Sequence, residues 1–169
     1  ISTQPHPHRL RHQGEAGTHP MRIDGYFDER YEPPAPFIRA TLISRALKLE
    51  HTIELHVDTG AAASILLDKD VKRLKIDISE LRTAERDLIG IGGLLKTQII
   101  EDAILIFRSA DGPPIIEKLH LLVGTHDPTK LSLKEKETIL KLPSLLGRDV
   151  MYRFKLMIDK LRNQIYLER

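Results

Sequence analysis

The chain contains no cysteine among its 169 residues. The sequence therefore excludes disulfide bonds, thiolate catalysis and zinc sites with cysteine ligands, and it is typical of a protein from a reducing compartment. Tryptophan is also absent and aromatic residues make up only 5% of the chain, so we expect a core of aliphatic side chains. No apolar run approaches the roughly 20 residues that a transmembrane helix needs, so no membrane span is expected.

An excess of charge of one sign is also lacking. Lysine and arginine number 26 against 24 for aspartate and glutamate, which gives no electrostatic reason to expect a nucleic-acid partner. The first 20 residues hold three prolines, four of the eight histidines and few apolar side chains. We therefore expect residues 1–20 to form a disordered extension and residues 21–169 to form one domain. The extension lacks the apolar centre of a signal peptide, so we expect a cytoplasmic protein.

Short runs rich in β-branched residues alternate with turn residues through the rest of the chain. Such runs predict strands, and two pairs of them, at the start of the domain and at its end, predict hairpins. Asp68 is typical of a helix N-cap, and Ser132 with Glu135 has the spacing of a capping box. We therefore predict a mostly β, barrel-like domain with one or two short helices. The predicted strand segments are 37–44, 52–57, a glycine-containing hairpin at 88–100, 103–107, 115–123, 154–159 and 164–167.

The densest chemical signal follows the second of these segments, in the run Asp58-Thr59-Gly60-Ala61. An acid at the end of a strand, followed by a hydroxyl residue and a glycine, is typical of a carboxylate held on a tight turn. We expect the Thr59 hydroxyl to fix this turn by bonding a neighbouring backbone group. Alone, the triplet also fits an ordinary turn without chemistry, so two further elements of the sequence are needed to interpret it.

Two later segments complete a pattern with this triplet. They are the glycine-rich run Gly90-Ile91-Gly92-Gly93 and, near the end, Leu145-Leu146-Gly147-Arg148-Asp149. In this order the three elements resemble the retropepsin family, the retroviral-type aspartic proteases, over roughly residues 37–169. The helix after Asp58 and the terminal hairpin are closer to cellular and bacterial members than to viral ones. The resemblance implies a single-domain closed β-barrel with a flap hairpin, active as a homodimer.

The chain has a single Asp-Thr-Gly motif, so an aspartic protease site would need a second copy of the chain. Two-lobed aspartic proteases carry two Asp-Thr/Ser-Gly motifs and this chain carries one, so the second carboxylate has to come from another chain. Two Asp58 carboxylates about 3 Å apart cannot both be ionised and so share one proton. The ionised carboxylate activates a water, and the protonated one polarises the scissile carbonyl. We therefore predict an aspartic endopeptidase that needs no cofactor and no metal.

The resemblance also assigns supporting roles. Gly90, Ile91, Gly92 and Gly93 form the tip of the flap, which closes over an extended polypeptide. Ile65 and Leu145 line an apolar substrate pocket, so cleavage is expected between apolar residues. Thr59, Gly60 and Ala61 support the catalytic aspartate, and Leu146, Gly147 and Arg148 are structural residues beside it. Ala61 offers the dyad no hydroxyl, so we expect an optimum at mildly acidic rather than strongly acidic pH.

One position departs from the family pattern. Viral members carry an acid where this chain has Ala62, and that acid pairs with the arginine that corresponds to Arg148. Asp149 is interpreted as an N-cap, and the segment 164–169 is a candidate for the dimer contact. Two alternatives stay open: a catalytically weak retropepsin-like module for dimerisation or peptide binding, and a small β-barrel with a chance Asp-Thr-Gly.

The histidines offer no metal site. His51 and His56 are five positions apart on a predicted strand and so face opposite sides. His120 and His126 flank a predicted turn, where we expect both side chains to be solvated.

Overall fold

The protein was analysed as a computed structural model that describes residues 20–85, 88–90 and 93–169. The predicted disordered extension at 1–20 falls outside the described residues except at Pro20, and so do Ile91 and Gly92 of the predicted flap tip.

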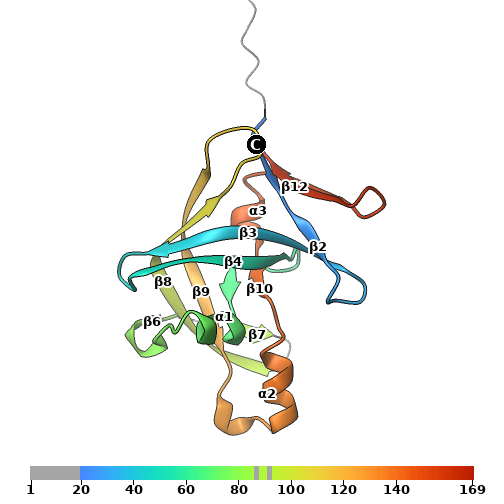
Figure 1. The fold of residues 1–169 in the computed structure, drawn as a ribbon. Helices are drawn as coiled ribbons and strands as arrows, with labels where there is room; N and C mark the ends of the chain where they lie inside the picture. The colour runs from blue at the N-terminus through green and yellow to red at the C-terminus, as the bar shows by residue number, and fades with distance from the viewer. Residues whose placement is uncertain (1–19, 86–87, 91–92) are drawn as a thin grey trace, which may run out of the picture.

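Six strands close into a barrel (Figure 1). Each strand pairs with the next around the ring, and β8 returns to pair with β3, with Leu42 opposite Leu105. The mostly β, closed-barrel fold expected from the sequence is therefore confirmed. In order around the ring, the strands are β3 (Ala35–Ser44), β4 (Leu49–Val57), β10 (Ser144–Leu146), β5 (Ile65–Leu66), β9 (Ile115–Thr125) and β8 (Gly93–Phe107).

Three more strands extend the barrel. β2 (Tyr26–Asp28) pairs with β3, β6 (Arg82–Thr83) pairs with β8, and β7 (Leu88–Gly90) forms a hairpin with the start of β8. The sequence predicted a hairpin at 88–100 and a separate strand at 103–107, but β8 joins the second arm of the hairpin to that strand as one strand of 15 residues. The pairing register with β9 shifts between Ile100 and Ala103, at the predicted gap between the two segments. A β-bulge of this kind bends a strand without ending it.

The β3–β4 hairpin shows why these residues form strands. The inward positions of both strands, among them Ile38, Leu42, Ile53 and Leu55, are buried, and the positions between them are polar or partly exposed. This alternation matches the two-residue period of a strand with one face on the core. The core around them consists largely of isoleucine, leucine and valine, as expected from the scarcity of aromatic residues.

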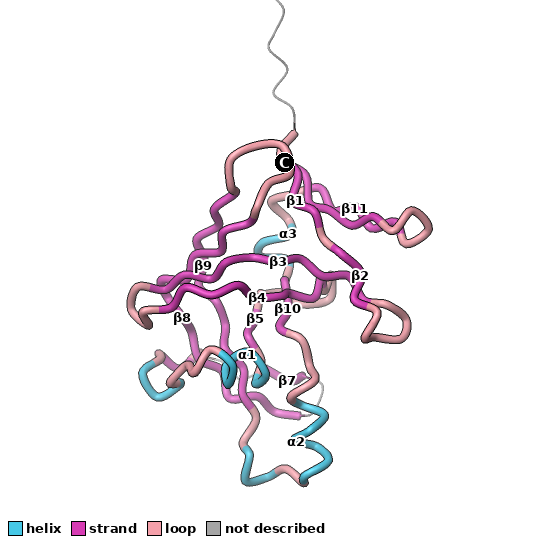
Figure 2. The backbone as a smooth tube through the Cα atoms, viewed as in Figure 1, coloured by secondary structure: helices cyan, strands magenta, loops and turns pink. Residues whose placement is uncertain are grey.

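The described residues form three short α-helices, which are cyan in Figure 2. They are α1 (Asp68–Arg73), α2 (Leu133–Ile139) and α3 (Arg148–Met151), with single 3₁₀ turns at Ile78–Glu80 and Pro128–Lys130. The capping box of Ser132 and Glu135 is present at the start of α2.

The prediction that Asp68 is an N-cap was wrong. Leu67 occupies that position and Asp68 is the first helical residue. The Asp68 carboxylate instead accepts hydrogen bonds from the backbone N–H and the ring Nδ1 of His126, at 3.0 and 2.7 Å. His126 is correspondingly buried, so its predicted exposure to solvent was wrong as well. A partner distant in sequence thus takes the place of the local cap.

The two ends of the described chain meet in a second, smaller sheet, which we call the terminal sheet. It consists of β1 (Arg22–Asp24), β12 (Gln164–Glu168) and β11 (Lys155–Asp159), with β12 in the middle. The backbones of Met21 and Arg169 exchange two hydrogen bonds of 2.8 and 2.9 Å. The predicted terminal hairpin is therefore confirmed, and it carries a third strand from the start of the domain.

No helix in the described ranges is both long and apolar enough to cross a bilayer.

Candidate active site

Asp58 is the first residue after β4, at the start of a loop that we call the Asp58 loop (58–64). Its Oδ1 accepts hydrogen bonds from the backbone N–H groups of Gly60 and Ala61, at 2.8 and 3.3 Å. Its own N–H donates to the carbonyl of Leu146 in β10, at 3.2 Å. Within the described part of the chain, Oδ2 receives no hydrogen bond. One carboxylate oxygen is thus fixed by the loop, and the other is left to interact with water, substrate or a partner.

Gly60 and Thr59 contribute differently from what the sequence predicted. A Cβ on Gly60 would lie 3.1 Å from Asp58 Oδ1, so a side chain at this position would crowd the carboxylate. Thr59 is exposed, and its hydroxyl makes no hydrogen bond with any described residue. The prediction that Thr59 fixes the turn through a backbone bond was therefore wrong for the single chain, because the Asp58 carboxylate itself holds the turn.

Gly147 supports the loop from behind. A Cβ on Gly147 would lie 2.3 Å from the carbonyl carbon of Ala63, closer than any real Cβ contact, so only glycine fits there. The N–H of Gly147 donates to Ser64 Oγ at 3.0 Å, and the N–H of Arg148 donates to the Ala61 carbonyl at 3.0 Å. The residues Leu146, Gly147 and Arg148 therefore contact the Asp58 loop directly through their backbones.

Ser64 is a supporting residue that the sequence did not reveal. It is fully buried, and Asp149 Oδ1 accepts hydrogen bonds from both its N–H and its hydroxyl, at 3.0 and 2.8 Å. The prediction that Asp149 is an N-cap was wrong, since Gly147 holds the cap position of α3. Its carboxylate links α3 to the Asp58 loop instead, a contact that the separation of 85 positions hides from any local pattern.

A row of paired residues crosses the sheet next to Asp58. Phe37 pairs with His56, His56 with Leu145, Leu145 with Ile65, and Ile65 with Leu122. Paired residues point to the same face of a sheet, so this row forms one continuous surface beside the catalytic candidate.

The apolar end of this row belongs to a small hydrophobic cluster that is separate from the main core, which we call the satellite cluster. Its members are Ile65, Leu67, Leu95, Leu122, Leu142 and Leu145. Of the two predicted pocket residues, Ile65 is only 4% exposed and packs inside the cluster, whereas Leu145 is half-buried. Leu146 is fully buried in the main core.

The other end of the row is aromatic. The ring centroids of Phe37 and His56 are 5.4 Å apart, and Tyr26 and Tyr31 pack against the same phenylalanine at 5.9 and 5.4 Å. Burial lowers the pKa of His56, and the negative charge of Asp58 opposes that effect. The sequence analysis weighed His56 only as a metal ligand. Its position two residues before Asp58, on the same face of the strand, could have indicated that it lies beside the site.

The predicted flap corresponds to the hairpin of β7 and β8. Gly90 pairs with Gly93 at its end, and Ile91 and Gly92 between them lie outside the described residues. Leu95, at the base of the hairpin, is a buried member of the satellite cluster. The hairpin is therefore anchored next to Ile65 and Leu145, the predicted pocket residues.

Arg148 lacks the acidic partner that viral retropepsins carry at the position of Ala62. Ala62 is exposed and Arg148 is half-buried, and the Arg148 guanidinium makes no ion pair with a described residue. In the same described ranges, no group of three or more histidine, aspartate or glutamate side chains is arranged to hold a metal ion.

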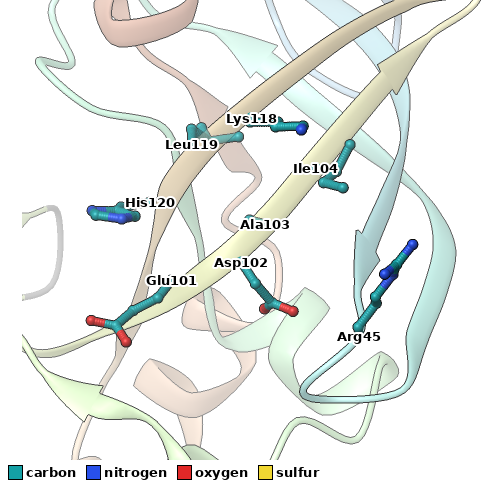
Figure 3. A pocket seen from close by; sticks show the side chains of 8 residues that line it. All are labelled: Arg45, Glu101, Asp102, Ala103, Ile104, Lys118, Leu119 and His120. Atoms are coloured by element: carbon teal, nitrogen blue, oxygen red, sulfur yellow. The ribbon is translucent and has the colours of Figure 1, made fainter.

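A pocket of about 630 Å³ lies elsewhere, at the bulge of β8 (Figure 3). One of its two carboxylates, Asp102, accepts hydrogen bonds from Ser44 Oγ at 2.6 Å and from the N–H of Ala46 at 2.9 Å. These bonds lower the pKa of Asp102 and commit it to the β3–β4 turn. None of the predicted site residues lines the cavity; its lining residues are Arg45, Glu101, Asp102, Ala103, Ile104, Lys118, Leu119 and His120.

Comparison with solved structures identifies the fold. A retropepsin-like aspartic protease from Rickettsia conorii aligns over 89% of this chain and 92% of its own, with a TM-score of 0.50 and 20% sequence identity. The EIAV protease in complex with the inhibitor HBY-793 aligns over 73% of this chain and 93% of its own, with a TM-score of 0.43 and 20% identity. The retroviral protease-like domain of Ddi1 from Leishmania major covers 88% and 93%, with a TM-score of 0.37 and 12% identity.

No protein-family model and no curated protein matches the sequence. The Rickettsia structure nevertheless shows that the chain has the retropepsin-like fold, which the motif pattern implied.

Proposed function

We propose that the protein is an aspartic endopeptidase whose active site is shared between two identical chains. The observation that carries this proposal is the state of the Asp58 carboxylate. Oδ1 is held by two loop amides, whereas Oδ2 receives no hydrogen bond from the described residues. A carboxylate fixed in this way beside an apolar surface is suited to act with a second carboxylate on a peptide bond.

The mechanism follows from bringing two such carboxylates together. At about 3 Å, one of them keeps a proton because two adjacent negative charges are unfavourable. The ionised Asp58 takes a proton from a bound water, and the resulting hydroxide attacks the scissile carbonyl carbon. The protonated Asp58 polarises the carbonyl oxygen, and a proton then passes to the leaving nitrogen as the C–N bond breaks. The amides of Gly60 and Ala61 keep one carboxylate oxygen in place during these steps.

The surroundings of Asp58 favour an extended polypeptide substrate with apolar side chains. Leu145 retains exposed surface next to Asp58 and lies beside Ile65 of the satellite cluster. The hairpin of β7 and β8, the predicted flap, would cover the substrate and exclude water. Because Ala61 offers no hydroxyl to the dyad, the proposed enzyme works best at mildly acidic pH.

Cleavage of an unfolded protein by the purified chain tests the proposal. Asp58→Asn should lower kcat/KM by on the order of 10²–10⁴-fold, because the amide can act neither as base nor as acid. Asp111→Asn is the matched control, since Asp111 is exposed and far from the site in sequence. Cleavage that persists in Asp58→Asn would rule out the aspartic mechanism.

The second candidate is a retropepsin-like module that dimerises or binds peptides with little turnover. It is favoured by Ala62 and by the absence of an ion pair for Arg148 among the described residues. This reading predicts saturable binding of extended peptides without cleavage, and affinities that are the same for the wild type and Asp58→Asn. Product peptides that appear only with the wild type would exclude it.

A further inference from the structure

A buried serine fastens β10, the strand that supports Asp58, to helix α1. Ser144 is the first residue of β10 and is fully buried. Its hydroxyl donates a hydrogen bond to Asp70 Oδ2 at 2.6 Å and accepts one from the backbone N–H of Leu67 at 3.1 Å. Leu67 is the N-cap of α1 and Asp70 lies in its first turn. The start of β10 is therefore held by the start of α1.

Asp70 is itself fixed on its other side. The residue is only 2% exposed, and its Oδ1 accepts hydrogen bonds from Nε and Nη2 of Arg73 at 3.1 and 3.0 Å. A buried carboxylate is stable when it is both paired with a charge and hydrogen-bonded, as it is here. Arg73 Nη2 also donates to the carbonyl of Thr52 in β4, at 3.1 Å. Helix α1 is thus tied to both β4 and β10.

The far end of β10 contacts Asp58 directly. The carbonyl of Leu146 accepts the hydrogen bond from the Asp58 N–H at 3.2 Å, and Leu146 pairs with Val57 at the end of β4. A strand rises about 3.3 Å per residue, so Ser144 and Leu146 are only about 7 Å apart along β10. A displacement of Ser144 would therefore be passed on to the acceptor of the Asp58 amide.

The other end of the Asp58 loop is held in the same manner. The hydroxyl of Ser64 donates to Asp149 and accepts from the N–H of Gly147, the N-cap of α3. The hydroxyl of Ser144 makes the same two kinds of bond with the start of α1. Each serine thus binds one aspartate and one N-cap amide of a short helix. The loop is fixed at its end by Ser64 and at its beginning, through β10, by Ser144.

We infer that Ser144 and Asp70 are positioning residues for Asp58. Neither acts on the substrate; together they set the place of β10 and, through Leu146, the place of the Asp58 backbone. The inference rests on the proposed function, because the position of Asp58 affects a rate only if Asp58 takes part in the reaction. Two carboxylates that share a proton have to lie about 3 Å apart, so a small displacement of either one lowers the rate.

The β3–β4 turn offers a matched control for a substitution at Ser144. Ser44 is also buried, and its hydroxyl donates to Asp102 at 2.6 Å and accepts from the N–H of Leu47 at 3.2 Å. It pairs with Leu49, at the opposite end of β4 from Asp58. Ser144→Ala and Ser44→Ala therefore remove the same kinds of hydrogen bond, one beside the candidate site and one far from it.

Steady-state cleavage by these two variants tests the inference, at a temperature where urea denaturation shows both to be folded. Ser144→Ala should lower kcat by about 10- to 100-fold with little change in KM, whereas Ser44→Ala should keep kcat near that of the wild type. The pH profile of kcat should also narrow in Ser144→Ala, because carboxylates that lie farther apart repel each other less.

The partner of Ser144 supplies a second pair of variants in case Ser144→Ala does not fold. Asp70→Asn keeps an oxygen that can accept from the Ser144 hydroxyl, and it should retain more of the wild-type kcat than Asp70→Ala does. Equal kcat values in the two Asp70 variants would contradict the role of this bond.

Hydrogen exchange of the Asp58 amide reads the position of the loop without any activity. Exchange should be faster in Ser144→Ala than in the wild type and unchanged in Ser44→Ala. If the wild type cleaves in an Asp58-dependent way while Ser144→Ala keeps the wild-type kcat, the positioning role is overturned and the protease proposal stands. If the wild type does not cleave, the proposed function fails. Faster exchange in Ser144→Ala alone would then still show that Ser144 holds Asp58, and equal exchange in both variants would refute that as well.

Discussion

Individual residues around Asp58 are fixed by steric fit as much as by hydrogen bonds. Gly147 is in contact with the backbone of Ala63, and Gly60 leaves just enough space for the Asp58 carboxylate. Glycine is needed at 147 because a side chain would overlap the Ala63 backbone, whereas a Cβ at 60 would press on the Asp58 carboxylate. The Asp58-Thr59-Gly60 motif is therefore only part of the site. Residues packed against the loop, Gly147 among them, also keep the Asp58 carboxylate in position.

Gly147→Ala should destabilise the fold and displace the Asp58 loop. The added Cβ would lie 2.3 Å from the carbonyl carbon of Ala63, so backbone has to move, and the expected loss is about 1–3 kcal/mol of unfolding free energy. Urea denaturation measures it. Gly112→Ala is the control, because its nearest neighbour would be 3.7 Å away. Equal stability of the two variants would contradict the steric argument.

His56 should make stability depend on pH. Burial lowers its pKa in the folded state, so the unfolded chain binds more protons between that lowered value and the ordinary value of about 6.5. Stability conferred by the neutral ring is therefore present above this window and is lost as the pH falls through it. His56→Leu should flatten the slope of unfolding free energy against pH there.

The control for this measurement is His51→Leu, which removes an exposed histidine from the same strand. A slope that changes equally in both variants would contradict the role given to His56.

Elements near the site are joined by contacts between segments far apart in sequence. Ser64 and Asp149 tie the Asp58 loop to α3, and Asp68 and His126 tie α1 to the end of β9. These side chains replace the local caps that the sequence predicted. The elements themselves were predictable: strand alternation and turn residues located both hairpins, and the capping box located α2.

What the sequence could not predict is how the elements are joined. The continuity of β8 across its bulge, the insertion of β10 between β4 and β5, and the central place of β12 all depend on long-range pairing. Asp68 and Asp149 looked like caps because a short acidic side chain favours that position locally, and a tertiary partner prevailed in each case. Asp58 was identifiable because its motif is local, whereas Ser64 was not.

Ser64→Ala should loosen α3 from the Asp58 loop. The change removes the hydroxyl that accepts from the Gly147 N–H and donates to Asp149, and it leaves buried polar groups without partners. The expected cost is about 1–3 kcal/mol in thermal or urea unfolding, together with lower cleavage activity. Ser79→Ala, at an exposed serine that bonds Asp77, is the matched control and should cost less. A loss of the same size in both would argue against the link.

At the scale of the whole molecule, the proposed site exists only in the assembly. A single barrel presents one Asp58, and the proposed dimer would bring a second Asp58 beside it. The absence of cysteine means that no covalent bond holds such an assembly, so its population depends on protein concentration.

Adding the inactive Asp58→Asn chain to the wild type should therefore reduce the activity of the wild-type chains. When wild type and Asp58→Asn exchange freely in equal amounts, about half of the wild-type chains pair with a mutant chain, and activity should fall to about half that of the wild type alone. Specific activity of the wild type should also fall on dilution. Activity that stays proportional to the amount of wild-type chain in the mixture would show that each chain carries a complete site.

The insertion of β10 between β4 and β5 also makes the Asp58 loop depend on a late part of the sequence. Ser144–Leu146 pairs with Leu55–Val57, and Leu146 accepts the hydrogen bond from the Asp58 amide. Contacts between such distant segments form late, because a long loop has to close first. A nascent chain that has reached only α2 has no β10, and its aspartate has no strand against which to settle. The Asp58 loop therefore cannot be complete before residues 144–146 have been synthesised.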